Sequence, residues 1–118
     1  MADKATIWHY PRCSKSRKTL ALLRDAEVDV QVRHYLDDPP SVDELTEAVD
    51  QLGIPADKLV RTKEDRYAEL DVDEEAMNTH DWLQLLADNP KLIQRPIVFT
   101  SRGAAVGRPP EAVHEILA

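Results

Sequence analysis

The hydrophobic pattern changes twice within the first 35 residues, and this change constrains the fold more than any other feature of the sequence. Residues 5–10 are β-branched and aromatic and end at Pro11, which predicts a strand. Residues 14–27 place apolar side chains at helical spacing, and residues 28–35 alternate apolar with polar side chains as a second strand does. The order strand, helix, strand predicts a parallel pair joined by a right-handed crossover.

The middle of the chain is predicted to be helical. Ser41 and Glu44 have the spacing of a capping box, which predicts that a helix begins there, and Gly53 is typical of its end. Apolar side chains continue at helical spacing from residue 55 to residue 90. We therefore expect a helical insertion at about residues 41–90.

The C-terminal part predicts two more strands and a closing helix. Residues 96–100 form an apolar, β-branched segment, and residues 104–107 follow after a turn that ends in glycine. Pro109 and Pro110 suit the first turn of a helix. The complete order predicts an α/β fold of the thioredoxin-like (glutaredoxin-like) type, with a mixed four-stranded sheet and a helical insertion.

Length and composition favour a single soluble domain. A chain of 118 residues, 42% hydrophobic and 31% charged, is typical of one compact domain spanning residues 1–118. Apolar runs are far shorter than the ~20 residues that span a bilayer, and the N-terminus does not have the pattern of a signal peptide. We therefore expect a cytoplasmic protein with no membrane association.

The charge and the metal-ligating side chains exclude further classes. A net charge of −7 disfavours nucleic-acid binding. One cysteine cannot form an internal disulfide, and the four histidines do not have the spacing of metal ligands. We therefore expect no metal.

The cysteine, Cys13, lies in a basic segment of an otherwise acidic chain. Acidic side chains are absent between Asp3 and Asp25, whereas basic side chains recur there: Lys4, Arg12, Lys15, Arg17, Lys18 and Arg24. Cys13 follows the first predicted strand and precedes the first predicted helix, and both a helix N-terminus and nearby cations stabilise a thiolate. We therefore interpret Cys13 as a reactive thiolate rather than as a small buried apolar side chain.

The residues after Cys13 suit an anion and an external thiol. Backbone N–H groups at Ser14, Lys15 and Ser16 could bind an oxyanion, with Arg17 adding positive charge. Cys13 and Ser16 have the spacing of a Cys-x-x-Cys redox motif, with serine in place of the second thiol. Since serine cannot resolve a mixed disulfide, an external thiol such as glutathione has to do so.

The stretch Ile7–Leu20 resembles the N-terminal signature of the glutathione- and glutaredoxin-coupled arsenate reductase family. Residues 59–64, 89–98 and 107–111 resemble three further motifs of that family, in the same order. The characterised reductases carry glycine and threonine between the cysteine and Ser-Arg. The Cys-Ser-Lys-Ser-Arg sequence at residues 13–17 is more similar to a less characterised paralogous branch.

The resemblance implies a set of site residues. Arg61, Arg95 and Arg108 match three arginines that bind the oxyanion beside the catalytic cysteine. His9 matches a histidine that favours the thiolate, and Pro96 matches a proline whose preceding peptide bond is cis.

The resemblance also implies a reaction. Arsenate would be reduced to arsenite through a Cys13 thiol-arsenate intermediate, with glutathione as co-substrate, glutaredoxin as partner protein, and no bound metal or organic cofactor. Such a reaction would serve arsenic detoxification.

Two alternative functions remain open. The first is a monothiol glutaredoxin-like oxidoreductase that acts on glutathione mixed disulfides or on another oxyanion. The second is an Spx-like regulator that binds RNA polymerase. Typical Spx-like proteins carry a two-cysteine switch, and Ser16 in place of a second cysteine disfavours that alternative.

Overall fold

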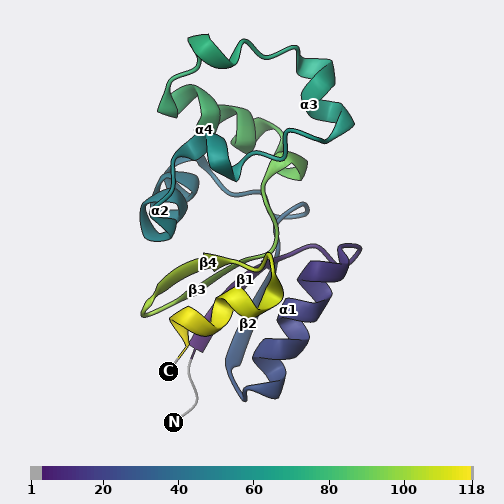
Figure 1. The fold of residues 1–118 in the computed structure, drawn as a ribbon, viewed down its shortest axis with the longest axis vertical. Coiled ribbons are helices and arrows are strands. Elements are labelled where there is room, and N and C mark those ends of the chain that lie inside the picture. Colours follow the sequence, from purple (N-terminus) through teal and green to yellow (C-terminus); the bar gives the residue numbers. More distant parts are fainter. Residues whose placement is uncertain (1–3, 118) are drawn as a thin grey trace. The chain divides into compact units, whose positions relative to one another are not determined.

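The structure is a computed structural model, which describes residues 4–117. The chain forms two compact units, one made of Met1–Asp38 with Arg95–Ala118 and the other of Pro39–Gln94. The second unit contains the predicted helical insertion, and Figure 1 shows its helices. The organisation as one domain over residues 1–118 stays a prediction, and residues 1–3 and 118 of that span lie outside the described residues.

The first unit contains a mixed four-stranded sheet in the order β2-β1-β3-β4 (Figure 1). β1 and β2 are parallel, whereas β3 is antiparallel to both β1 and β4. The strand bounds are Lys4–His9 for β1, Asp29–His34 for β2, Ile97–Thr100 for β3 and Gly103–Val106 for β4. The predicted sheet is therefore confirmed, although β4 begins and ends one residue earlier than predicted.

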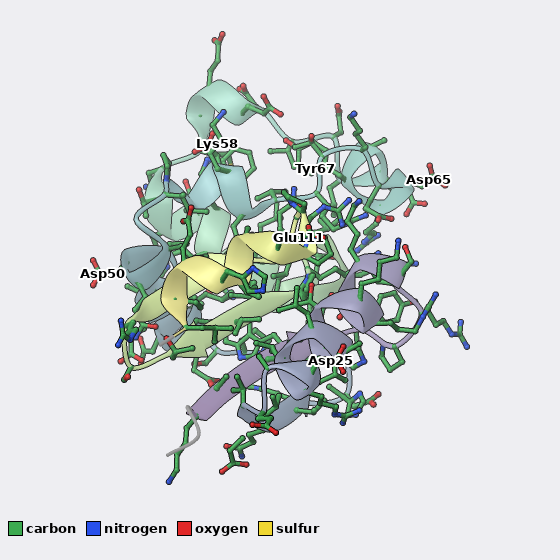
Figure 2. All side chains as sticks on the ribbon, turned by 60° about the horizontal axis from the view of Figure 1, so that its bottom comes forward. Asp25, Asp50, Lys58, Asp65, Tyr67 and Glu111 are labelled. Carbon is green, nitrogen blue, oxygen red and sulfur yellow. The ribbon has the colours of Figure 1, made fainter. Side chains whose placement is uncertain are left out.

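Two helices cover one face of this sheet. Helix α1, Ser14–Asp25, connects β1 to β2, and the 3₁₀ helix η4, Pro110–Ile116, follows β4. Side chains of both helices and of the sheet form one buried cluster: Ala5, Ile7, Leu20, Leu23, Val98, Val113 and Ile116. Figure 2 shows both helices with their side chains, including the exposed Asp25 of α1 and Glu111 of η4. This packing fixes the start of α1 at the end of β1.

The second unit is helical. Its α-helices are α2 (Val42–Leu52), α3 (Asp65–Leu70) and α4 (Thr79–Asp88), and its 3₁₀ helices are η1 (Ala56–Leu59), η2 (Glu74–Ala76) and η3 (Pro90–Leu92). Leu45 of α2, Leu59 of η1 and Leu86 of α4 are fully buried in this unit, as expected of the apolar face of each helix.

The helix bounds of the second unit follow from capping side chains. Ser41 and Glu44 form the predicted capping box, and Gly53 ends α2 in the left-handed region at φ 67°. Asn78 and Asp81 form a second capping box at the start of α4. Among the described residues, none of the helices is long and apolar enough to cross a membrane.

Candidate active site

Cys13 is the N-cap residue of α1 and ends the loop that follows β1. Its backbone is extended, at φ −90° and ψ 122°, and its N–H donates to the carbonyl of Tyr10 at 3.0 Å. Its carbonyl accepts the N–H of Arg17 at 3.0 Å, which is the first hydrogen bond of the helix. The residue is partly exposed. The backbone of Cys13 is therefore held at both ends while the thiol remains accessible.

The N-terminal N–H groups of α1 lie next to Cys13 in the chain. Within the described residues, α1 has no capping hydrogen bond from a side chain and no acidic residue in its first turn. The backbone N–H groups of Ser16 and Lys15 nevertheless act on the thiol of Cys13 and lower its pKa. Because these donors are the positive end of the helix dipole, they favour a thiolate over a neutral thiol.

The pKa of the Cys13 thiol lies below its ordinary value. Burial is the largest single effect and acts in the opposite direction, because it disfavours the anion. The N–H groups of Ser16 and Lys15 and a hydrogen bond from the Arg95 side chain outweigh it, together with the positive charge of Arg95. Cys13 is therefore more ionised near neutral pH than a free cysteine.

Arg95 brings a buried guanidinium to this thiol from a distant part of the sequence. The residue is 7% exposed and lies two residues before the start of β3. Its Cζ atom lies 4.7 Å from the centroid of the Tyr10 ring, which places the cation over the aromatic face. A thiolate beside a desolvated guanidinium can attack an electrophilic centre whose developing negative charge that guanidinium stabilises.

Arg108 approaches the backbone of Arg95. Its Nη1 donates to the carbonyl of Arg95 at 3.3 Å, so two of the three predicted arginines lie together in the first unit. The peptide bond between Arg95 and Pro96 is cis, the isomer that the resemblance implies.

Gly107 lets the segment after β4 approach α1 closely. Its N–H donates to the carbonyl of Pro96 at 2.9 Å. A Cβ atom at this position would lie 2.5 Å from Thr19 Oγ1 and 2.8 Å from Pro96 Cγ. Thr19 is fully buried, and its hydroxyl donates to the carbonyl of Lys15 at 2.8 Å. Any side chain at residue 107 would therefore separate Pro96 from the helix that carries Cys13.

His9 contacts Ser16. The Nδ1 atom of His9 lies 2.6 Å from Ser16 Oγ, which also accepts the N–H of Tyr10 at 3.1 Å. Burial, then the charges of His34, Arg24 and Arg17, lower the pKa of His9, so its imidazole is neutral near pH 7. An effect of His9 on the thiol therefore runs through Ser16, whose N–H lowers the pKa of Cys13.

The remaining predicted anion-binding residues lie in the first turn of α1. The N–H groups of Lys15 and Ser16 lower the pKa of the Cys13 thiol, and Ser14 is the first residue of the helix. Arg17 uses its N–H within the helix, and its Nη1 donates to the carbonyl of Pro11 at 2.8 Å. Arg17 therefore ties the loop before Cys13 to the helix.

Arg61 belongs to the second unit. Its Nε donates to Glu64 Oε1 at 3.0 Å, and both side chains are about four-fifths buried, with 20% and 23% exposed. Its N–H donates to the carbonyl of Leu92 at 2.7 Å. Its place beside Cys13 stays a prediction from the resemblance.

Three functional features were not predicted from the sequence: the Tyr10 ring beside Arg95, the buried hydroxyl of Thr19, and the close approach at Gly107. The sequence carries a signal for the close approach only: Gly107 directly follows an apolar strand, and a glycine there indicates close approach of backbone segments. Across the described part of the chain, there is no group of three or more His, Cys, Asp or Glu side chains that could hold a metal ion.

Comparison with known proteins places this site in a family. The sequence model of the ArsC family matches residues 8–116, which is nearly the whole chain. This chain belongs to the ArsC family. The match contains every predicted site residue of the ArsC chain, from His9 to Arg108.

Individual relatives of this ArsC protein are similar over almost their full length. An arsenate reductase from Neisseria meningitidis serogroup A is 41% identical over 112 residues, covering 94% of this chain and 96% of the relative. A solved structure of an arsenate reductase from Vibrio cholerae is 43% identical, with a TM-score of 0.95 over 99% of this chain and 100% of that chain. A solved structure from Yersinia pestis is 54% identical, with a TM-score of 0.90 over 95% and 99%. The α/β thioredoxin-like fold predicted from the sequence is thereby confirmed.

Proposed function

We propose that this ArsC protein reduces arsenate to arsenite, with Cys13 as the nucleophile and with glutathione and glutaredoxin as the source of electrons. The observation that carries the proposal is the thiol of Cys13 at the start of α1, whose pKa is lowered by the N–H groups of Ser16 and Lys15 and by the side chain of Arg95. Relatives named arsenate reductase, at about 40% identity, support arsenate as the oxyanion.

The first step is attack of the Cys13 thiolate on arsenic. A sulfur–arsenic bond forms, one arsenic–oxygen bond breaks, and the departing oxygen leaves as water after taking up protons from the solvent. The guanidinium groups of Arg95 and Arg108, with Arg61 added by the resemblance, would neutralise the dianionic substrate and its adduct.

The second step transfers two electrons. The thiol of glutathione displaces a second oxygen from arsenic and forms its own sulfur–arsenic bond. A glutaredoxin thiolate then attacks the glutathione sulfur, which makes a mixed disulfide and leaves the bonding electron pair on arsenic. Arsenic is thereby reduced from the pentavalent to the trivalent state. Hydrolysis of the bond to Cys13 releases arsenite and regenerates the thiol.

A steady-state assay with arsenate, glutathione and glutaredoxin tests this proposal. We expect turnover by the wild type, none by Cys13→Ser, and a loss of at least tenfold in kcat/KM for Arg95→Gln. Arg102→Gln, in the exposed turn between β3 and β4, is the matched control and should retain wild-type turnover. Turnover that persists in Cys13→Ser, or a wild type without turnover, would contradict the proposal.

Reduction of glutathione mixed disulfides is a second candidate function. The observation that favours it is the position of Ser16, whose side chain is fully buried and bonded to His9 and to the N–H of Tyr10. Ser16 is therefore a structural residue, and Cys13 is the only thiol of the motif, as in a monothiol enzyme. Reduction of a glutathionylated model substrate that is unaffected by Arg61→Gln and Arg108→Gln would support this candidate over oxyanion reduction.

A further inference from the structure

Tyr10 is bonded through its backbone to the loop and helix that present the thiol. Its N–H donates to Ser16 Oγ at 3.1 Å, and its carbonyl accepts the N–H of Cys13 at 3.0 Å. These two bonds fix both sides of the Tyr10 backbone to α1 and to its N-cap. The backbone that carries the ring of Tyr10 is therefore held in a defined position relative to Cys13.

The same ring lies against the guanidinium of Arg95. The distance of 4.7 Å from Arg95 Cζ to the ring centroid is within the range in which an aromatic face attracts a cation. Arg95 is 7% exposed, so water screens this attraction little. An arginine side chain has several rotatable bonds, and a fixed aromatic face reduces the set of directions that its guanidinium can take.

We propose that Tyr10 is a positioning residue, whose ring holds the Arg95 guanidinium in place to act on the Cys13 thiol. The proposal deepens the proposed function, because it concerns the same thiol. Backbone bonds join Tyr10 to Cys13, and the aromatic face joins Tyr10 to Arg95. Tyr10 thus connects the two parts of the site that lie far apart in the sequence.

Several groups surround this arrangement. From α1, the N–H groups of Ser16 and Lys15 reach the sulfur, and neither depends on the ring of Tyr10. From β1, His9 bonds to Ser16. From the segment after β4, Arg108 bonds to the carbonyl of Arg95 and so fixes its backbone rather than its guanidinium. The ring of Tyr10 is therefore a contact that acts on the guanidinium itself.

The test measures the rate of Cys13 alkylation by iodoacetamide across pH in variants of the full chain. Tyr10→Leu removes the aromatic face and should raise the midpoint of the profile. At the wild-type midpoint pH the alkylation rate should fall about two- to fivefold. Tyr10→Phe keeps the aromatic face and should keep the wild-type midpoint. If the hydroxyl group were responsible, Tyr10→Phe would shift the midpoint as well.

A double-mutant cycle separates positioning from general structural damage. Arg95→Gln should raise the midpoint more than Tyr10→Leu does, and Tyr10→Leu should add no further shift when Arg95 is already glutamine. An unchanged midpoint in Tyr10→Leu, or an equal shift of that substitution in both backgrounds, would overturn the proposal.

A second variant covers the case in which Tyr10→Leu does not fold. Pentafluorophenylalanine at residue 10 keeps the shape of the ring and reverses the charge distribution of its face, so it should also raise the midpoint; no rise would overturn the proposal. Alkylation needs neither arsenate nor glutathione. The outcome therefore stands apart from the turnover assay, and either proposal can fail while the other holds.

Discussion

Helices α2 and α4 of the second unit begin differently from α1 of the first unit. In the second unit, α2 and α4 start with closed capping boxes, in which Ser41 and Asn78 accept a helix N–H while Glu44 and Asp81 accept the N–H of the cap residue. In the first unit, α1 starts at Cys13 with no side-chain capping hydrogen bond, and the N–H groups of Ser16 and Lys15 lower the pKa of the thiol instead.

The difference shows two uses of a helix N-terminus: one stabilises the helix itself, and the other stabilises a reactive thiolate. A capping box satisfies two N–H groups, one of the helix and that of the cap residue, by side chains within four residues of sequence. The start of α1 keeps its N–H groups for a thiolate and adds the buried guanidinium of Arg95 from the start of β3. The same backbone donors therefore stabilise the helix in one unit and lower the pKa of a nucleophile in the other.

The largest effect is expected from glycine substitutions that compare close packing in the two units. Gly107→Ala places a Cβ 2.5 Å from Thr19 Oγ1 and should lower the free energy of unfolding by about 3 kcal/mol, at the upper end of the usual overpacking cost. Gly53→Ala is the control, because its Cβ would meet no described heavy atom within 4 Å. Its φ of 67° should cost only about 1 kcal/mol. Urea unfolding measures both, and equal losses would show that Gly107 is not tightly packed.

Replacing Cys13 converts the start of α1 into one that resembles the start of α2. Serine is a favoured N-cap residue and alanine is not. The free energy of unfolding of Cys13→Ser should therefore be about 1 kcal/mol higher than that of Cys13→Ala. Neither variant should retain the nucleophile. Chemical denaturation of the two proteins, compared at pH 7, checks the difference. A Cys13→Ala protein as stable as Cys13→Ser would mean that the N–H groups of α1 gain nothing from an oxygen acceptor at this position.

The predictions that succeeded depended on local patterns. The parallel β1–α1–β2 unit follows from hydrophobic periodicity, and the bounds of α2 follow from Ser41, Glu44 and Gly53, because each of these signals acts within a few residues. The chemical environment of Cys13 was predicted in part for the same reason, since the position of a cysteine between a strand and a helix is visible in the sequence.

The features that were not predicted depend on tertiary contacts. The contact between Tyr10 and Arg95 joins the end of β1 to the start of β3, and periodicity carries no information about such a pair. Only the resemblance to the arsenate reductase family identifies Arg95 as a site residue, because a single arginine in a sequence is usually exposed. The segment after Pro109 was predicted as a helix, and it forms a 3₁₀ helix over Pro110–Ile116. Pro109 and Pro110 lack an N–H, and a short closing segment suits the tighter 3₁₀ form.

The pH dependence of stability reports on the protonation of His9 in the folded state. Its pKa in the folded state is lowered from 6.5, so the unfolded state binds more protons as the pH falls below about 6.5. The stability that neutral His9 contributes is therefore full above that pH and is lost as the pH falls through the folded-state value. The thermal midpoint of the wild type should decline below pH 6.5 more steeply than that of His9→Asn. Equal slopes for the two proteins would mean that the fold does not lower the pKa of His9, which would contradict this prediction.

The smallest effect concerns a tyrosine of the second unit. The side chain of Tyr67, labelled in Figure 2, donates its hydroxyl hydrogen to Glu74 at 2.6 Å. Burial and this carboxylate raise the pKa of Tyr67 from 10.0 to about 12. The stability contributed by this bond is full below about pH 10 and is lost as the pH rises through about 12. A difference absorbance titration of wild type against Tyr67→Phe should show one phenol that ionises near pH 12, whereas ionisation near pH 10 would show that the bond does not form in solution.

The central claim is that the start of α1 and the guanidinium of Arg95 together stabilise the Cys13 thiolate. The pH dependence of Cys13 alkylation tests it most directly. The account predicts a wild-type midpoint clearly below the value of about 8.5 for free cysteine, raised by Arg95→Gln and unchanged by Arg102→Gln. A wild-type midpoint at or above that of free cysteine, or one that Arg95→Gln leaves in place, would contradict it.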